Sequence, residues 1–190
     1  MMSWQLAQRD IPQGNTQKVL PHNIRRIKSI PRTTTKSLSY TIAMTLSTTT
    51  VRVRYAETDQ MGVAYYANYF IWCEIGRVEL LRQLGFDYKD MELEHACHLP
   101  VVEANCRYKS PARYDDVVII ETRVAALRSS VIKFVYRLLC TREPDADPVL
   151  LAEAETVHVV VDREMRKCPM PEPYFSVIRR SMGPETVSAG

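Results

Sequence analysis

The sequence predicts an α+β fold in which one antiparallel sheet wraps around a single buried helix. A strand-like alternation precedes one strongly apolar helical segment, four further strand-like segments follow it, and tight turns join those strands. A helix that is apolar around most of its circumference has to be covered on several sides, so we expect the sheet to curl around it. With 190 residues, of which 46% are hydrophobic, the chain is long enough for one domain with a sizeable core.

The first strand and the loop after it are predicted from a change of pattern. Residues 51–55 alternate apolar side chains with Arg52 and Arg54, which is typical of a half-buried strand. Asp59 and Gly62 then indicate a tight loop.

The central helix is predicted to begin at about Tyr66 or Asn68 and to run to Leu84, with Gly85 as its C-terminal stop. A glycine inside a helix costs about 1 kcal/mol relative to alanine. Gly76 therefore suggests a close backbone approach at this point of the helix, the alternative being a tolerated weakness.

The later elements follow from alternation and turn residues. An amphipathic turn is expected at residues 87–94 and a short basic helix at residues 174–182. His158 is predicted to be a packed strand histidine. Four strands are predicted between the two helical segments, at residues 99–108, 117–127, 131–140 and 149–162.

The N-terminal segment, residues 1–43, differs from the rest in holding seven basic residues and one acid. It buries too little apolar surface to offset its ordering entropy, so we expect a disordered basic extension. It is typical of a transit peptide, of a nucleic-acid-binding arm, or of sequence upstream of a true start at Met44, and we favour the last. The predicted domain is then residues 44–182, followed by a frayed C-terminus, residues 183–190.

The junction between the first strand and the helix is where we expect the chemistry. The first N–H groups of a helix lack intrahelical partners and carry about half a positive charge, so they can hold an oxyanion. If the loop folds back, the Asp59 carboxylate lies beside those donors with room for a carbonyl between them, as acyl transfer requires. Taken alone, an Asp followed by a loop Gly is more often ordinary turn chemistry.

The segment TDQMGVAYYANYF, preceded by RYAE and followed by a helix ending in ELLRQLG, resembles the signature of the hotdog-fold thioesterases. The resemblance is to the 4-hydroxybenzoyl-CoA thioesterase and YbgC-like type, and it runs from about residue 51 to residue 162. It implies a hotdog fold, with a five-stranded antiparallel sheet around a central helix, and hydrolysis of an acyl-CoA or aroyl-CoA thioester.

The resemblance also implies roles for individual residues. Asp59 falls on the catalytic carboxylate, acting as nucleophile or as general base, and the backbone N–H of Tyr66 falls on the group that polarises the carbonyl. Many YbgC-like members have His where this chain has Tyr66, so a role of that His is not carried over. We expect the substrate to contact five further residues, namely Gly62, Val63, Tyr65, Tyr69 and Arg128.

The expected partners follow from the same resemblance. In the turn at residues 127–130 only Arg128 is basic, so we expect either weaker CoA binding or an acyl group presented on a carrier protein. Family protomers pair edge to edge into dimers or tetramers, with the active site at the interface. The alternative is a non-catalytic acyl-CoA-binding or sensing module.

Other chemistries find little support in the sequence. His95, Cys97 and His98 lie close together, but a metal would need further ligands, so we predict no metal site and no cofactor. No apolar run is long enough to span a membrane, and no nucleic-acid partner is expected. The five cysteines show no CxxC spacing, which favours reduced thiols and a cytoplasmic location.

Overall fold

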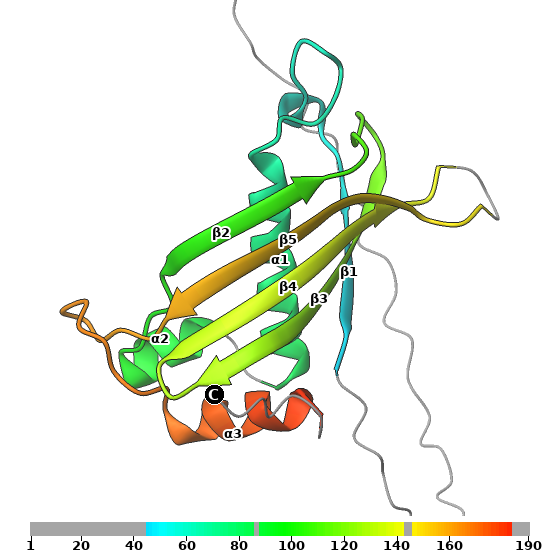
Figure 1. Cartoon of the computed structure of the whole chain (residues 1–190). Helices are drawn as coiled ribbons and strands as arrows, with labels where there is room; N and C mark the ends of the chain where they lie inside the picture. Colours follow the sequence, from blue (N-terminus) through cyan, green and yellow to red (C-terminus); the bar gives the residue numbers. More distant parts are fainter. Residues whose placement is uncertain (1–44, 86–87, 143–145, 184–190) are drawn as a thin grey trace, which may run out of the picture. The chain divides into compact units, whose positions relative to one another are not determined.

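The structure, a computed structural model, describes residues 45–85, 88–142 and 146–183. The predicted extension, residues 1–43, lies outside the described residues, as do residues 184–190 of the predicted C-terminus. Five strands form one antiparallel sheet in the order β1, β3, β4, β5, β2 (Figure 1). The strands are β1 Ser47–Arg52, β2 Val101–Tyr108, β3 Val117–Arg128, β4 Val131–Cys140 and β5 Val149–Val159. The helices are η1 Tyr55–Glu57, a single 3-10 turn, α1 Asn68–Gln83, α2 Tyr88–His95 and α3 Glu172–Ser181.

The sheet and α1 form two layers around one core. The long helix crosses one face of the sheet, and α2 and α3 lie at the end of α1 away from the loop that precedes it (Figure 1). Side chains alternate along the central strands, so that every second residue of β4, from Ile132 to Leu138, is buried toward the helix. The predicted α+β fold is therefore confirmed.

The helix α1 has the predicted bounds and the predicted close contact. It ends before Gly85, which adopts a φ of +94° and donates its N–H to the Arg82 carbonyl at 3.0 Å. A Cβ added at Gly76 would meet the side chain of Thr122, and it would lie 2.8 Å from a methyl group of Ile120. Only glycine allows the helix to lie so close to β3.

The prediction of a strand over residues 51–55 is wrong at its C-terminal end. β1 stops at Arg52, and Tyr55 begins the 3-10 turn with 79% of its surface exposed. The cause is local, because the Glu57 side chain accepts a hydrogen bond from the Arg54 N–H at 2.8 Å and bends the chain there.

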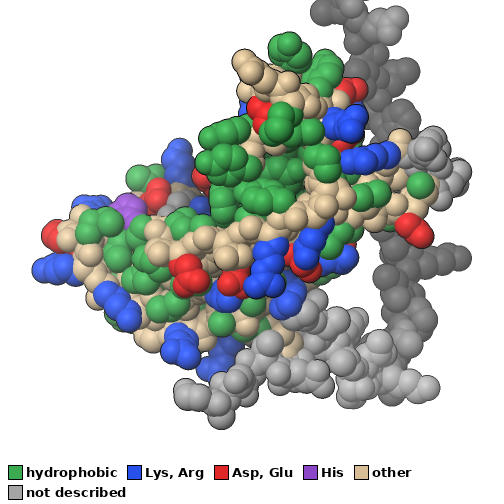
Figure 2. Space-filling view, turned by 45° about the horizontal axis from the view of Figure 1, so that its top comes forward, with side chains coloured by type: hydrophobic (Ala, Val, Ile, Leu, Met, Phe, Trp, Pro, Cys, Tyr) green, Lys and Arg blue, Asp and Glu red, His purple; other side chains and the backbone are tan. Residues whose placement is uncertain are grey.

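The edge strand β2 and the adjoining side of α1 leave apolar surface uncovered. Val101 is 54% exposed and Val102 59%, and Ile71 on the neighbouring helix is 48% exposed. Figure 2 shows hydrophobic side chains gathered into one contiguous group on the face seen there. A patch of this kind marks an interaction or ligand surface more often than a bare exterior.

Two further sequence predictions concern membranes and thiols. No helix in the part of the chain that the structure describes is long and apolar enough to cross a bilayer. The five cysteines, all of which lie in the described ranges, are free thiols.

Candidate active site

The loop between η1 and α1 is a closed turn that fixes the Asp59 side chain. The Asp59 N–H donates to the Val63 carbonyl, and the Gly62 N–H donates to the Asp59 carbonyl, both at 2.9 Å. One Asp59 carboxylate oxygen accepts from the Met61 N–H at 2.8 Å. Gly62 has a φ of +73°, which favours glycine. The predicted tight loop is confirmed, and among the described residues the second carboxylate oxygen accepts no hydrogen bond.

A pocket of about 330 Å³ lies between this loop, the start of α1 and the end of β2. Asp59 lines the pocket and is half-buried. The loop supplies the walls Met61 and Val63, and the end of β2 supplies Tyr108 and the segment 109–111. The pocket therefore gathers a carboxylate, apolar walls and aromatic rings in one concave surface.

Free hydrogen-bond donors sit at the start of α1, which lines the same pocket through Tyr66 and Tyr69. The N–H groups of Asn68 and Tyr69 donate to carbonyls three residues earlier, at 3.0 and 3.4 Å. Within the described ranges, the N–H groups of Tyr66 and Ala67 have no acceptor, and no side chain caps the helix. The amide of Tyr66 is therefore open to a ligand oxygen.

Two tyrosine hydroxyls tie the start of α1 to the end of β2. The Tyr108 hydroxyl donates to the Tyr66 carbonyl, and the Ala112 N–H donates to the Tyr69 hydroxyl oxygen, each at 3.0 Å. The two rings meet edge to face at 5.1 Å. Burial raises the pKa of Tyr69, so its hydroxyl stays neutral and the pocket wall carries no charge there.

The predicted site residues lie in the pocket lining, in the chain next to the pocket, or at the far end of the sheet. Asp59, Val63, Tyr66 and Tyr69 line the pocket, while Gly62 shapes the loop without lining it. Tyr65 lies outside the lining, with its ring against that of Tyr66 at 4.5 Å.

Arg128 lies at the far end of the sheet from this pocket. The start of β3 follows Arg113, which pairs with Val63 in the loop, and Arg128 is the last residue of that strand. Twelve residues of strand span about 36 Å, so the Arg128 of this protomer is remote from its own Asp59. Figure 1 shows the two ends of β3 at opposite ends of the sheet.

Sequence reasoning missed the walls that come from the end of β2. Tyr108 and Lys109 line the pocket because the chain after β2 returns to the loop, where the Ala64 N–H donates to the Ala112 carbonyl at 2.8 Å. Pro111 marks the end of a strand in the sequence. No local signal says which loop that strand end reaches.

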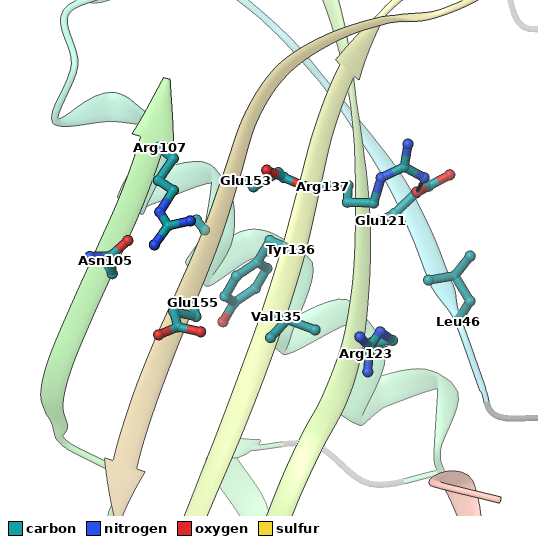
Figure 3. Close-up of a pocket in the computed structure, with 11 residues that line it drawn as sticks. Leu46, Asn105, Arg107, Glu121, Arg123, Val135, Tyr136, Arg137, Glu153 and Glu155 are labelled. Carbon is teal, nitrogen blue, oxygen red and sulfur yellow. Dashed lines mark hydrogen bonds and ion pairs between the residues drawn. The ribbon is translucent and has the colours of Figure 1, made fainter. Parts of the chain in front are cut away.

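A second hollow, of about 400 Å³, lies on the other face of the sheet and holds no comparable chemistry (Figure 3). Basic and acidic side chains alternate across its strands, and its acids form ion pairs with basic residues in the lining or next to it. Arg137 bonds Glu121 at 2.8 Å, and Lys133 bonds Glu155 at 2.7 Å beside it. This surface is a solvated lattice of ion pairs. Among the described residues, no group of three metal-ligating side chains is present.

Comparisons with known proteins agree with this geometry. Residues 53–178 match the family model of the thioesterase-like superfamily. The chain is 37% identical to YneP of Bacillus subtilis, over 65% of this chain and 86% of that protein. It is 35% identical to the acyl-CoA thioester hydrolase YbgC of Escherichia coli, over 59% of this chain and 79% of that protein.

The fold also matches solved structures. The 4-hydroxybenzoyl-CoA thioesterase from Pseudomonas superposes with a TM-score of 0.63 at 24% identity, covering 70% of this chain and 98% of that one. The expected hotdog fold is thus confirmed, as is the resemblance on which it rested. Taken together, the fold and the match over residues 53–178 mean that this chain belongs to the thioesterase-like superfamily.

Proposed function

We propose that the protein hydrolyses acyl-CoA thioesters, with Asp59 and the Tyr66 amide as the working pair. The observation that carries the proposal is that both residues line one pocket and that the Tyr66 N–H has no acceptor within the described residues. A thioester carbonyl held between them meets a carboxylate on one side and an oxyanion donor on the other. The name of the related Escherichia coli YbgC supports the substrate class.

Hydrolysis of a thioester requires few other catalytic groups. A thiol has a pKa of about 8.5, so the thiolate leaves without a catalytic acid. Asp59 either attacks the carbonyl to give a mixed anhydride that water opens, or it activates the water that attacks. In both routes the Tyr66 N–H and the positive end of α1 stabilise the oxyanion. One such hydrogen-bond donor lowers the activation free energy by about 3 to 4 kcal/mol in other enzymes.

The walls suit an acyl group with apolar surface. Tyr66, Tyr69 and Tyr108 present rings to the pocket, and the hydroxyls of the last two are already hydrogen-bonded. Those rings can therefore pack against an acyl or aryl chain without leaving a polar group unpaired.

We also propose that two copies pair through their β2 edges. As an edge strand, β2 offers backbone groups for pairing, and exposed Val101 lines one hollow together with exposed Ile71. Antiparallel pairing of two β2 strands would set the end of one sheet beside the opposite end of the other. Arg128 of the partner subunit would then lie at the end that holds Asp59, which accounts for its remoteness within one protomer.

The test is thiol release from a panel of short-chain, long-chain and aromatic acyl-CoAs. Asp59→Asn keeps the acceptor for the Met61 N–H but removes the nucleophile or base, so we expect kcat to fall by about 10³-fold or more. Asp115→Asn is the matched control. Its carboxylate lies at the same end of the sheet and bonds Arg52 at 3.0 Å outside the pocket, so activity should stay within about twofold.

Two outcomes would overturn the proposal. One is hydrolysis that persists undiminished in Asp59→Asn. The other is saturable binding of acyl-CoA without turnover, measured by calorimetry on the wild-type chain, which would favour the non-catalytic sensing module.

A further inference from the structure

A buried carboxylate lies two residues before Asp59 and is fully engaged. The Glu57 side chain accepts the Arg54 backbone N–H at 2.8 Å and two guanidinium N–H groups of Arg54 at 2.6 and 3.1 Å. The Trp72 side chain, on the second turn of α1, also helps to lower the pKa of this carboxyl. Glu57 is only 5% exposed, whereas the Arg54 side chain is 74% exposed and closes the site from outside.

The backbone of the same residue binds the start of the helix. The Glu57 carbonyl accepts the Tyr65 N–H at 2.8 Å and the Asn68 side-chain amide, also at 2.8 Å. Tyr65 immediately precedes Tyr66, and Asn68 is the first residue of α1. One residue therefore bonds the chain just after β1, the chain before the helix, and the helix itself.

We propose that Glu57 is the positioning residue that sets the spacing between the Asp59 carboxylate and the Tyr66 amide. The inference rests on the proposed function, because it concerns the alignment of that pair. Asp59 is two residues from Glu57 along the chain, and Tyr66 follows a residue that Glu57 binds directly. We call Glu57 and the bonds it accepts the hub. Movement of the hub therefore changes the position of Asp59 relative to Tyr66.

The Glu57 carboxylate is buried as a charged group, and the proposed positioning role explains why. Burial alone pushes the pKa of the Glu57 carboxyl upward, but the hydrogen bonds from Arg54 outweigh burial and hold that pKa below its usual value. The carboxylate is therefore charged at neutral pH and accepts from several donors at once. A multiply bonded ion holds its neighbours more firmly than a neutral side chain does, and displacement of a catalytic group by about 1 Å can cost about 10²-fold in rate.

The experiment compares Glu57→Ala, Glu57→Gln and Asp59→Asn in the full chain, each assayed well below its melting temperature. Glu57→Ala removes every side-chain bond of the hub, so we expect kcat to fall by about 10²-fold with KM within about twofold. Glu57→Gln keeps the length and one acceptor oxygen. It should retain at least about a tenth of wild-type kcat, because the role is spatial and no proton is transferred.

A stability-matched control separates positioning from general damage. Tyr136→Phe removes a buried hydroxyl bonded to Thr156 at 2.9 Å, far from the loop, and should lower the melting temperature without lowering kcat. Should Glu57→Ala fail to fold, Asn68→Ala takes its place. It deletes one bond to the Glu57 carbonyl on a half-buried side chain, and we expect a fall in kcat of about tenfold with little loss of melting temperature.

Three outcomes would overturn the inference: a kcat for Glu57→Ala no lower than that of Tyr136→Phe, a loss carried by KM, or a Glu57→Gln variant as inactive as Asp59→Asn. The last would make Glu57 a proton-transfer group. None of them touches the proposed function, which fails separately if the wild-type chain releases no thiol or if Asp59→Asn keeps full activity.

Discussion

The two faces of α1 differ in how closely the rest of the protomer packs against them. Toward the sheet, Trp72 and Leu80 are buried, and the backbone at Gly76 lies against β3 so closely that a methyl group would collide. On the side toward β2, Ile71 and Ile75 are 48% and 37% exposed. The same helix is thus packed to the limit on one face and left open on the other.

Beneath the open face lies a hollow of about 230 Å³ with a polar floor on the sheet, and the charged side chains of Glu74 and Arg77 on α1 also line it. The His158 Nδ1–H donates to the Leu99 carbonyl at 2.9 Å, so its Nε2 accepts the Thr156 hydroxyl, also at 2.9 Å. Thr156 in turn accepts the Tyr136 hydroxyl at 2.9 Å. The difference between the faces indicates that both faces of this helix are suited to packing, and that the protomer covers only the face toward the sheet.

The largest expected effect comes from charging the open face. Ile71→Asp places a carboxylate where we propose that a second copy docks. An unpaired buried charge costs about 3 to 5 kcal/mol and a two-fold pair buries two, so the dimer Kd should rise by about 10³-fold or more. Sedimentation velocity measures it, with circular dichroism to show that the protomer stays folded.

Leu93→Asp is the control for that measurement, since Leu93 is 65% exposed on α2 and does not line the hollow. It should leave the molecular mass unchanged. If Ile71→Asp leaves the mass unchanged as well, the open face is not where the copies meet.

The second effect, a pH dependence of stability, tests whether His158 in the polar floor stays uncharged in the folded protein. Burial lowers the pKa of His158 to about 4 from an ordinary value of 6.5. Because the unfolded chain takes up this proton first, stability is lost as the pH falls from about 6.5 to 4, by about 3 kcal/mol in all. Urea unfolding at several pH values measures the slope, and the difference from His158→Gln isolates this residue from the carboxylates. Parallel curves for the two proteins would contradict it.

The smallest effect concerns the packed face. Gly76→Ala drives a methyl group into Thr122 and Ile120, for which overpacking costs about 1 to 3 kcal/mol, while helix propensity returns up to about 1. We expect a net loss of about 1 to 2 kcal/mol and a melting temperature about 3 to 6 °C lower by calorimetry. Gln83→Ala adds a smaller gain in helix propensity at an exposed position and should raise the melting temperature slightly. A rise in both variants would mean that the helix does not lie so close to β3.

Much of the fold was predictable because its signals are local. The run from Asn68 to Leu84 and the stop at Gly85 show in the sequence as apolar residues followed by a glycine, and Gly76 stands out against them. Tyr55 was mispredicted because its strand-like alternation competes with the Glu57 cap on Arg54. A side chain reaching back three residues overrides a period-2 pattern.

The site was predictable only in part, for reasons of topology. Asp59 and Tyr66 lie within one continuous motif, so the resemblance of that motif to a known family was enough to suggest them. Tyr108 reaches the pocket from 42 residues beyond Tyr66, through the pairing of two strands distant in sequence. Glu57 looks like any loop acid in the sequence, and the bonds it accepts are apparent only in the structure.

The wall formed by Tyr108 has a consequence for how the molecule is made. β2 joins the sheet through β5, where Tyr108 pairs with Ala152, so the pocket cannot close before that strand exists. A ribosome adding about 5 to 20 residues per second makes residue 152 roughly 5 to 20 s after Asp59. During that interval the nascent chain carries the whole motif without the pocket wall that β2 supplies, so the pocket forms late in synthesis.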